Sequence, residues 1–259
     1  HGDTLGAVSV GGIELFHGAY GPLLFGTHRV EPGDSAQLER VLDMHGEEVA
    51  AMIVEPLVQG AAGIRVQPPG YLRRVRDLCD RHGVLLICDE VAAGFGRTGT
   101  MFACEQASIR PDFICLSKGL TGGYLPLSVV VTTEPIYQAF YADYASHKAF
   151  LHSHSYTGNA LACRAALATL DIFRDDDVIS RNRALAARMA RATAALADHP
   201  HVSEVRQTGM ILAIELVQDK ATRTPYPGPE RRGRRVYRHA LERGALLRPL
   251  GDVIYFRPP

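Results

Sequence analysis

The run VLLICDEVAAGFGRTG at residues 84–99 decides the fold, because it joins a continuous apolar stretch to two carboxylates and a glycine-rich turn. The apolar half is typical of a strand that is buried on both faces of a parallel sheet. The helical pattern YLRRVRDLCDRHG precedes it at 71–83, and Gly83 is placed to end that helix. Further apolar runs predict strands at 49–54, 112–117 and 127–133. Alternating strands and helices of this kind predict an α/β fold with a mostly parallel sheet.

The pattern changes in the last third of the chain. Two long helices are expected at 158–174 and 177–198, and an antiparallel strand pair follows in VSEVRQTG and MILAIELV. A basic helix at 230–243 and the short strands ALLRP and DVIYFRP complete the pattern. Strands gathered with helices in this order predict a smaller α+β domain. We therefore expect a large domain at 1–172 and a small C-terminal domain at 173–259.

Composition excludes several classes of function. The 259 residues carry 28 basic and 28 acidic side chains, so no overall field attracts nucleic acid or an anionic membrane surface. No apolar run approaches the roughly 20 residues that a membrane-spanning helix needs. None of the five cysteines has zinc-ligand spacing, and most lie in apolar runs. The cysteines are therefore expected to be buried thiols in a reducing cytoplasm. The balanced charge and the short apolar runs predict that neither nucleic acid nor a membrane is a partner.

Two groups that can do chemistry follow neighbouring strands of the predicted sheet. Asp89 belongs to the run at 84–90, and Lys118 follows the run at 112–117. Ligands of parallel sheets bind beyond the carboxyl ends of the strands, where a lysine is partly desolvated and becomes nucleophilic toward a carbonyl. A carboxylate beside it can hold a protonated ring nitrogen, which is the arrangement that pyridoxal phosphate requires. A buried ion pair between two strand ends gives the same pattern.

Three other stretches have both a functional and a structural interpretation. The turn GFGRTG at 94–99 brings the backbone close to a ligand or is only a tight turn. The stretch HSHSYTGN at 152–159 suits an anion at a helix start, or Ser155 or Asn159 simply caps that helix. Its two histidines have no third ligand nearby, so no metal is predicted. Arg248 ends a short apolar strand, where an arginine binds a carboxylate bidentately or lies on the surface.

Several motifs together resemble a known family. IVEP, QGAAG, LLICDEVAAGFGRTGTMFACE, PDFICLSKGLTGGYLPLS and HSHSYTGNALAC stand in the order found in the class III (ω-amino) aminotransferases. The resemblance covers essentially all 259 residues. The opening HGDTLGAVSVGG and the stretch HSHSYTGN are similar to the group of these enzymes that acts in biotin synthesis. The resemblance implies a pyridoxal 5′-phosphate-dependent transferase of fold type I, with a cofactor-binding large domain and a smaller α+β C-terminal domain.

The resemblance also implies which residues hold the cofactor. Lys118 matches the lysine that forms a Schiff base with pyridoxal phosphate, and it is the expected catalytic residue. Asp89 matches the partner of the pyridine nitrogen. Val91 matches the residue that packs on the face of the ring.

Other implied contacts involve a second subunit and the substrate. His154 and Ser155 match the pair that reaches the cofactor phosphate from the neighbouring subunit, so the resemblance implies a homodimer with shared active sites. Ser153 matches the adjoining substrate contact. Arg248 matches the arginine that receives the carboxylate of the keto acid.

The implied reaction converts 8-amino-7-oxononanoate to 7,8-diaminononanoate in the cytoplasm, with S-adenosylmethionine or lysine as amino donor. The partners would then be small molecules and a second copy of the chain. Two other hypotheses remain: a class III ω-aminotransferase with a different substrate, and a catalytically inactive scaffold of the same fold.

The sequence departs from the family in several places. The stretch QGAAG at 59–63 lacks the glutamate that masks the substrate arginine in some members, and Ala92 replaces a common glutamine. Ser153 stands where the biotin group usually has glycine. The family also carries a Gly-Ser phosphate turn and a substrate-stacking tyrosine upstream of HGDT, and neither is in this chain. We therefore expect a piece of a longer protein, with an N-terminally truncated large domain.

Overall fold

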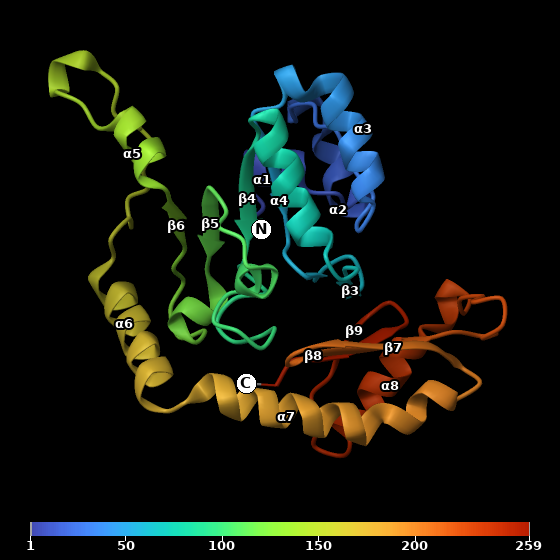
Figure 1. Cartoon of the computed structure of the whole chain (residues 1–259). Coiled ribbons are helices and arrows are strands. Elements are labelled where there is room, and N and C mark those ends of the chain that lie inside the picture. Colours follow the sequence, from blue (N-terminus) through green and yellow to red (C-terminus); the bar gives the residue numbers. More distant parts are fainter. Residues whose placement is uncertain (1, 259) are drawn as a thin grey trace.

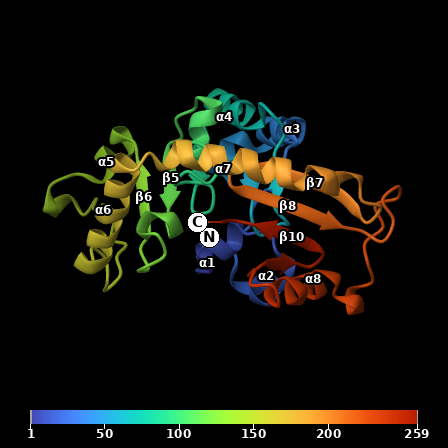
Figure 2. The ribbon, with the colours of Figure 1, turned by 90° about the horizontal axis from the view of Figure 1, so that it is seen from below.

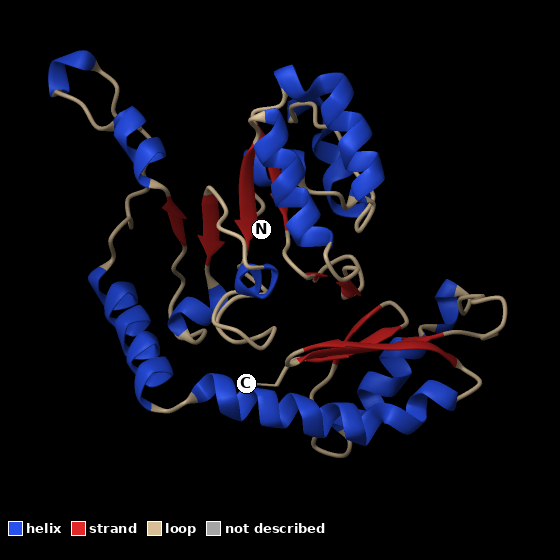
Figure 3. Ribbon diagram, in the orientation of Figure 1, coloured by secondary structure: helices blue, strands red, loops and turns tan. Residues whose placement is uncertain are grey.

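The computed structural model describes residues 2–258 and contains two four-stranded sheets (Figures 1 and 3). The first sheet has the order β1-β4-β5-β6. Its strands are β1 (Ala51–Val54), β4 (Leu85–Asp89), β5 (Phe113–Leu116) and β6 (Val129–Thr132). The first three run parallel and β6 is antiparallel to β5, which confirms the mostly parallel sheet predicted from the sequence.

Helices α3 (Ser35–His45) and α4 (Tyr71–His82) cover one face of this sheet. The Asp34 carboxylate caps α3 by accepting a hydrogen bond of 2.8 Å from the amide of Gln37. Gly83 ends α4 with a φ of +67°, as its position in the sequence predicted. Core side chains from the two helices and the sheet include Leu38, Leu42, Val75, Leu78, Leu86 and Cys88.

The edge strand β6 departs from the expectation that both faces of the sheet are covered. Val129, Val130 and Val131 are 38%, 62% and 48% exposed. These apolar side chains are therefore less covered than their composition predicts. Within the described residues, no strand pairs with the outer edge of β6. Helix α5 (Glu134–Phe140) follows and projects away from the sheet (Figure 1).

The second sheet has the order β7-β8-β10-β9 and is antiparallel between all of its neighbours. Its strands are β7 (Val202–Thr208), β8 (Ile211–Leu216), β9 (Arg248–Leu250) and β10 (Val253–Phe256). Alternate residues of β8 face opposite sides. Leu212 and Ile214 pack with Met189 of α7 (Val178–Thr193), the helix that runs along the sheet in Figure 2.

The other face of this sheet packs against a hairpin of the first domain. The hairpin consists of β2 (Val58–Gln59) and β3 (Arg65–Val66), and its residues Val58 and Ile64 contact Ile211 and Ala213.

One arginine of β7 fastens this contact. Arg206, with a side chain only 10% exposed, donates hydrogen bonds of 2.7 Å to the carbonyl oxygen of Ile64 and 2.5 Å to that of Gly63. Its guanidinium also lies 2.5 Å from a carboxylate oxygen of Glu215. A carboxylate oxygen of Glu204 also lies 3.2 Å from this guanidinium. Four acceptors therefore satisfy this largely buried cation, and the two parts of the molecule are joined there.

The predicted helices of the C-terminal part are also present, as α6 (Ala160–Asp175), α7 and α8 (Arg232–Leu241). The remaining helical elements are α1 (Leu5–Val10), α2 (Glu14–His17), η1 (Gly18–Leu23), η2 (Gly46–Glu48), η3 (Ala103–Ala107), η4 (Lys118–Thr121), η5 (Tyr144–Ser146), η6 (Ala194–Asp198) and η7 (Gly228–Glu230). The proposed boundary at residue 172 lies within α6, between the two sheets in the chain. Among the described residues, no helix has the length and apolar character to cross a membrane.

Candidate active site

Asp89 and Lys118 lie at the carboxyl ends of two adjacent parallel strands. Asp89 is the last residue of β4 and is paired in register with Cys115 of β5, and Lys118 begins η4 directly beyond β5. The Asp89 carboxylate is buried, and one of its oxygens accepts a hydrogen bond of 3.0 Å from the amide of Val91. The sheet therefore brings together the pair that the sequence pattern singled out.

Two glycine-rich motifs, GFGRTG at 94–99 and SKGLTGG at 117–123, pack against each other beside Lys118. A Cβ atom added to Gly119 would lie 2.8 Å from the Cβ of Phe95, so only glycine fits after this lysine. Phe95 belongs to GFGRTG and is buried with Leu116 and Leu120. The motif GFGRTG therefore acts at least partly as a structural support for the lysine turn. Lys118 itself has a φ of +46°, a conformation that side chains rarely adopt.

The electrostatic surroundings of Lys118 lower the pKa of its amine. Burial is the largest cause, and the nearby guanidinium of Arg257 is the next. The carboxylates of Asp89 and Glu55 act in the opposite direction, and Arg248 adds to the lowering. The amine is therefore more readily deprotonated than that of an exposed lysine, which a nucleophile requires.

The two carboxylates that end the apolar run have different environments. Glu90 is completely buried and accepts hydrogen bonds of 2.9 and 2.8 Å from the amides of Ala103 and Cys104, which holds the η3 turn in place. Burial raises the pKa of Glu90 despite these two bonds. Glu90 therefore has a structural role in the η3 turn.

Glu55 is a further, partly buried acid near the lysine, and the sequence analysis did not single it out. It follows β1 in the motif IVEP and accepts a hydrogen bond of 2.9 Å from the amide of Gly60. Burial raises the pKa of Glu55, and the charge of Asp89 acts in the same direction. Only its position at the end of a strand neighbouring β4 could have indicated this proximity.

The C-terminal part of the chain, around the second sheet, contributes a hollow with two arginines. It is lined by Tyr237, Leu246, Leu247, Arg248, Pro249, Tyr255 and Arg257. Arg248 begins β9 and is paired with Tyr255 of β10, and Arg257 follows that strand. None of the ion pairs found among residues 2–258 involves Arg248, so its guanidinium is available to a carboxylate. Arg248 is exposed, so its role as a carboxylate ligand remains a prediction, and Arg257 lies in the same hollow.

Ser153, His154 and Ser155 lie in an exposed loop between η5 and α6. The loop closes on itself, because the amide of Tyr156 donates a hydrogen bond of 3.1 Å to Nδ1 of His154. The cap of α6 comes from Asn159, whose side chain accepts a hydrogen bond of 3.0 Å from Ala162. Ser155 is therefore not the helix cap, and the phosphate-binding interpretation of this loop remains a prediction.

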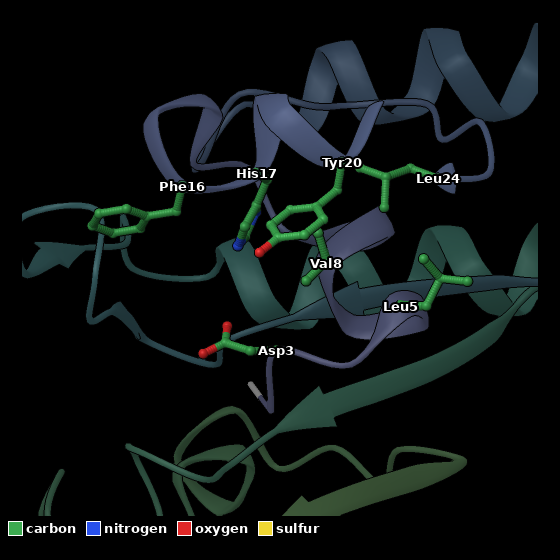
Figure 4. A pocket seen from close by; sticks show the side chains of 7 residues that line it. All are labelled: Asp3, Leu5, Val8, Phe16, His17, Tyr20 and Leu24. Carbon is green, nitrogen blue, oxygen red and sulfur yellow. The ribbon is translucent and has the colours of Figure 1, made fainter. Parts of the chain in front are cut away.

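A second pocket lies in the N-terminal segment (Figure 4). The residues that line it are Asp3, Leu5, Val8, Phe16, His17, Tyr20 and Leu24. None of the predicted site residues takes part. Asp3 belongs to the HGDT motif, of which His1 lies outside the described residues.

Comparison with known proteins identifies the family. The sequence model of the class-III aminotransferases matches residues 1–259. The chain belongs to this family. It is 52% identical over its whole length to the adenosylmethionine-8-amino-7-oxononanoate aminotransferase of Nitratidesulfovibrio vulgaris and 48% identical to that of Geobacter sulfurreducens. It spans 51% and 61% of the lengths of these two class-III aminotransferases.

Solved structures of class-III aminotransferases have the same fold. The adenosylmethionine-8-amino-7-oxononanoate aminotransferase of Methanocaldococcus jannaschii matches the whole chain with a TM-score of 0.96 and 43% identity, over 61% of its own length. The ω-transaminase of Pseudomonas jessenii in complex with PMP matches with a TM-score of 0.89 and 29% identity, also over 61% of its length. The fold-type expectation from the sequence is therefore confirmed.

Class-III aminotransferases use pyridoxal 5′-phosphate, and the residues present here fit that cofactor. The site offers an amine of lowered pKa for the aldehyde carbon and a buried carboxylate on the neighbouring strand for the ring nitrogen. Val91 lies two residues beyond Asp89, just after the carboxyl end of β4. These are the groups that the large domain of this chain can supply.

Proposed function

We propose that the intact protein transfers an amino group to 8-amino-7-oxononanoate and forms 7,8-diaminononanoate for biotin synthesis. The observation that carries this proposal is the placement of Asp89 and Lys118 at adjacent parallel strand ends, with Arg248 close enough to influence the amine. The names of the most similar curated relatives support the choice of substrate. The amino donor is S-adenosylmethionine or lysine.

Each residue has one task in the proposed mechanism. When bound, pyridoxal phosphate supplies an electron sink for the substrate carbon. Lys118 would hold the cofactor through its amine, and it would move a proton to and from the substrate carbon as general base and acid. Its lowered pKa suits this task, because the amine must lose its proton before it accepts another. Asp89 would hold the ring nitrogen in its protonated form, and Val91 would pack on the face of the ring.

Arg248 is proposed to bind the substrate at its far end. The keto acid carries a carboxylate remote from the ketone, and a guanidinium can hold that carboxylate with two parallel hydrogen bonds. The 59–63 loop has no glutamate to compete for this arginine. Ser153 is proposed as a neighbouring substrate contact.

The protein is proposed to act as a homodimer in the cytoplasm. Support comes from the exposed loop of Ser153, His154 and Ser155 and from the apolar side chains near it, since Tyr144 is 94% and Leu151 is 91% exposed. Large exposed apolar groups of this kind favour an interface. A second subunit there would bring His154 and Ser155 to the phosphate of its neighbour. The five unpaired cysteines favour a reducing compartment.

One assay separates this function from its rivals. The intact protein is incubated with pyridoxal phosphate, 8-amino-7-oxononanoate and either S-adenosylmethionine or lysine, and 7,8-diaminononanoate is measured by mass spectrometry. The product is expected with at least one donor. Turnover of simple ω-amines without this product would favour another class-III aminotransferase, and cofactor binding without turnover of any amine would favour a scaffold.

A further inference from the structure

Three ligand-type side chains meet at the carboxyl end of α3, away from the lysine site. They are His28 in the loop after η1, His45 at the end of α3 and Glu48 at the end of η2. One ligand atom from each lies within 4.8 Å of the others. The imidazole rings of His28 and His45 are stacked, with centroids 4.3 Å apart and an interplanar angle of 21°. We propose that these three residues bind a divalent transition-metal ion, of which zinc is the best match.

The chemistry of the donors selects the ion. Two imidazole nitrogens and one carboxylate form a set that suits zinc, with further positions left for water. Magnesium and calcium prefer oxygen ligands, so neither suits a site with two histidines.

The backbone also favours a cation here. His45 and Glu48 are three residues apart at the end of a helical segment, so their side chains project from the same side. The carboxyl end of a helix carries partial negative charge from its last carbonyl groups, and this attracts a cation. His28 arrives from a separate loop, so a bound metal would connect two segments that are distant in sequence.

The loop that contains His28 also contributes to the N-terminal pocket. The amide of Phe25 donates a hydrogen bond of 3.3 Å to the hydroxyl of Ser9 in α1, and Leu24 lines the pocket of Figure 4. Metal binding at His28 would hold this loop against α3. The ion is therefore proposed to stabilise the N-terminal segment, and no part in the transamination is assigned to it.

Other side chains nearby could also act as metal ligands. His82 of α4 lies beside Gly46, where an added Cβ would be 3.2 Å from its Nδ1 atom. Its Nε2 atom is 3.4 Å from a carboxylate oxygen of Asp43. Burial raises the pKa of the Cys79 thiol to about 11 and that of the Cys104 thiol to about 12, which disfavours the thiolate form that binds a metal.

Zinc titration of the intact, tag-free protein with its cofactor bound tests the proposal. A competing chromophoric chelator reports affinity and stoichiometry, and one zinc per chain is expected at this site. His45→Ala and Glu48→Gln should each weaken binding by about tenfold or more. Glu48→Gln keeps the size of an exposed side chain, so it separates loss of a ligand from misfolding.

The chain offers a matched control. His199 and His201 form another imidazole pair, with ring centroids 5.7 Å apart, that belongs to no three-ligand group among the described residues. His201→Ala should leave zinc binding unchanged. Zinc should also raise the melting temperature of the wild-type protein but not that of His45→Ala. Equal zinc affinity in wild type, His45→Ala and Glu48→Gln would overturn the proposal.

Discussion

Arg257 donates a hydrogen bond of 3.2 Å to the main-chain carbonyl oxygen of Ala92, three residues beyond Asp89. This bond joins the last strand of the small sheet to the strand end that carries the buried carboxylate. It also fixes a guanidinium near Lys118, and of the charged neighbours Arg257 lowers the pKa of that amine the most. The segment that follows β10 therefore affects the reactivity of the lysine that follows β5.

Replacement of this cation should change the pH dependence of cofactor capture. In Arg257→Met the pKa of Lys118 should rise, because a nearby positive charge that disfavours protonation is lost. The amine then stays protonated to higher pH, so the capture of pyridoxal phosphate by the cofactor-free protein shifts to higher pH. Stopped-flow absorbance measures this rate. Arg235→Met, an exposed change on α8, is the matched control, and identical profiles in both variants would contradict the assignment.

Asp89→Asn should retain the fold and lose most of the activity. An amide cannot stabilise a protonated ring nitrogen, and the loss of such an interaction in a desolvated site costs about 2–4 kcal/mol, or roughly 30- to 1,000-fold in rate. Glu90→Gln provides the contrast, since Glu90 supports the η3 turn and its change should lower the melting temperature instead. An Asp89→Asn rate within about threefold of wild type would argue against a catalytic contact.

Arg248→Ala should slow the half-reaction with the keto acid by roughly 10- to 150-fold, because a charge-assisted contact with the substrate carboxylate is lost. A donor that carries an α-carboxylate could use the same arginine, and both half-reactions would then slow. The methyl ester of the keto acid is the informative control. Wild type should prefer the acid and the variant should not, whereas the same preference in both proteins would place the carboxylate elsewhere.

Subunit mixing tests whether Ser155 serves a neighbouring site. Lys118→Ala alone should be inactive, because no other residue can hold the cofactor covalently. When Lys118→Ala and Ser155→Ala chains are combined, one site of the mixed dimer carries both changes and the other carries neither. Activity should therefore recover on mixing. Mixed dimers verified by mass spectrometry that remain inactive would indicate that each chain supplies its own phosphate contact.

The sequence predicted those features that depend on local pattern. The cap at Gly83, the strand β4 and the lysine turn each follow from a few neighbouring residues, and parallel strand ends bring Asp89 and Lys118 together. The direction of β6 was not predictable, since an apolar run is equally compatible with parallel and antiparallel pairing. The exposure of its valines likewise depends on which segments pack over them, and composition does not encode this.

Contacts between segments that are distant in the chain could not be predicted from the sequence either. Arg257 reaches the site only because β10 ends beside the turn that follows β4, and an arginine in YFRPP gives no sign of this. Glu55 is similar, because its proximity to Lys118 depends on strand order. His28 and His45 have no recognisable ligand spacing and meet only through the loop that precedes α3.

The bonds of Arg206 to Gly63 and Ile64 restrict how this protein can be redesigned. The 59–63 stretch is an obvious target for anyone who wishes to retune substrate choice by loop exchange, since it is short and lies between two strands. A transplanted loop would still have to present its carbonyl groups to the same guanidinium. Gly63 has a φ of +95°, so the donor loop also needs glycine at that position. A successful graft should therefore carry the loop, Arg206 and Glu215 together as one exchangeable module.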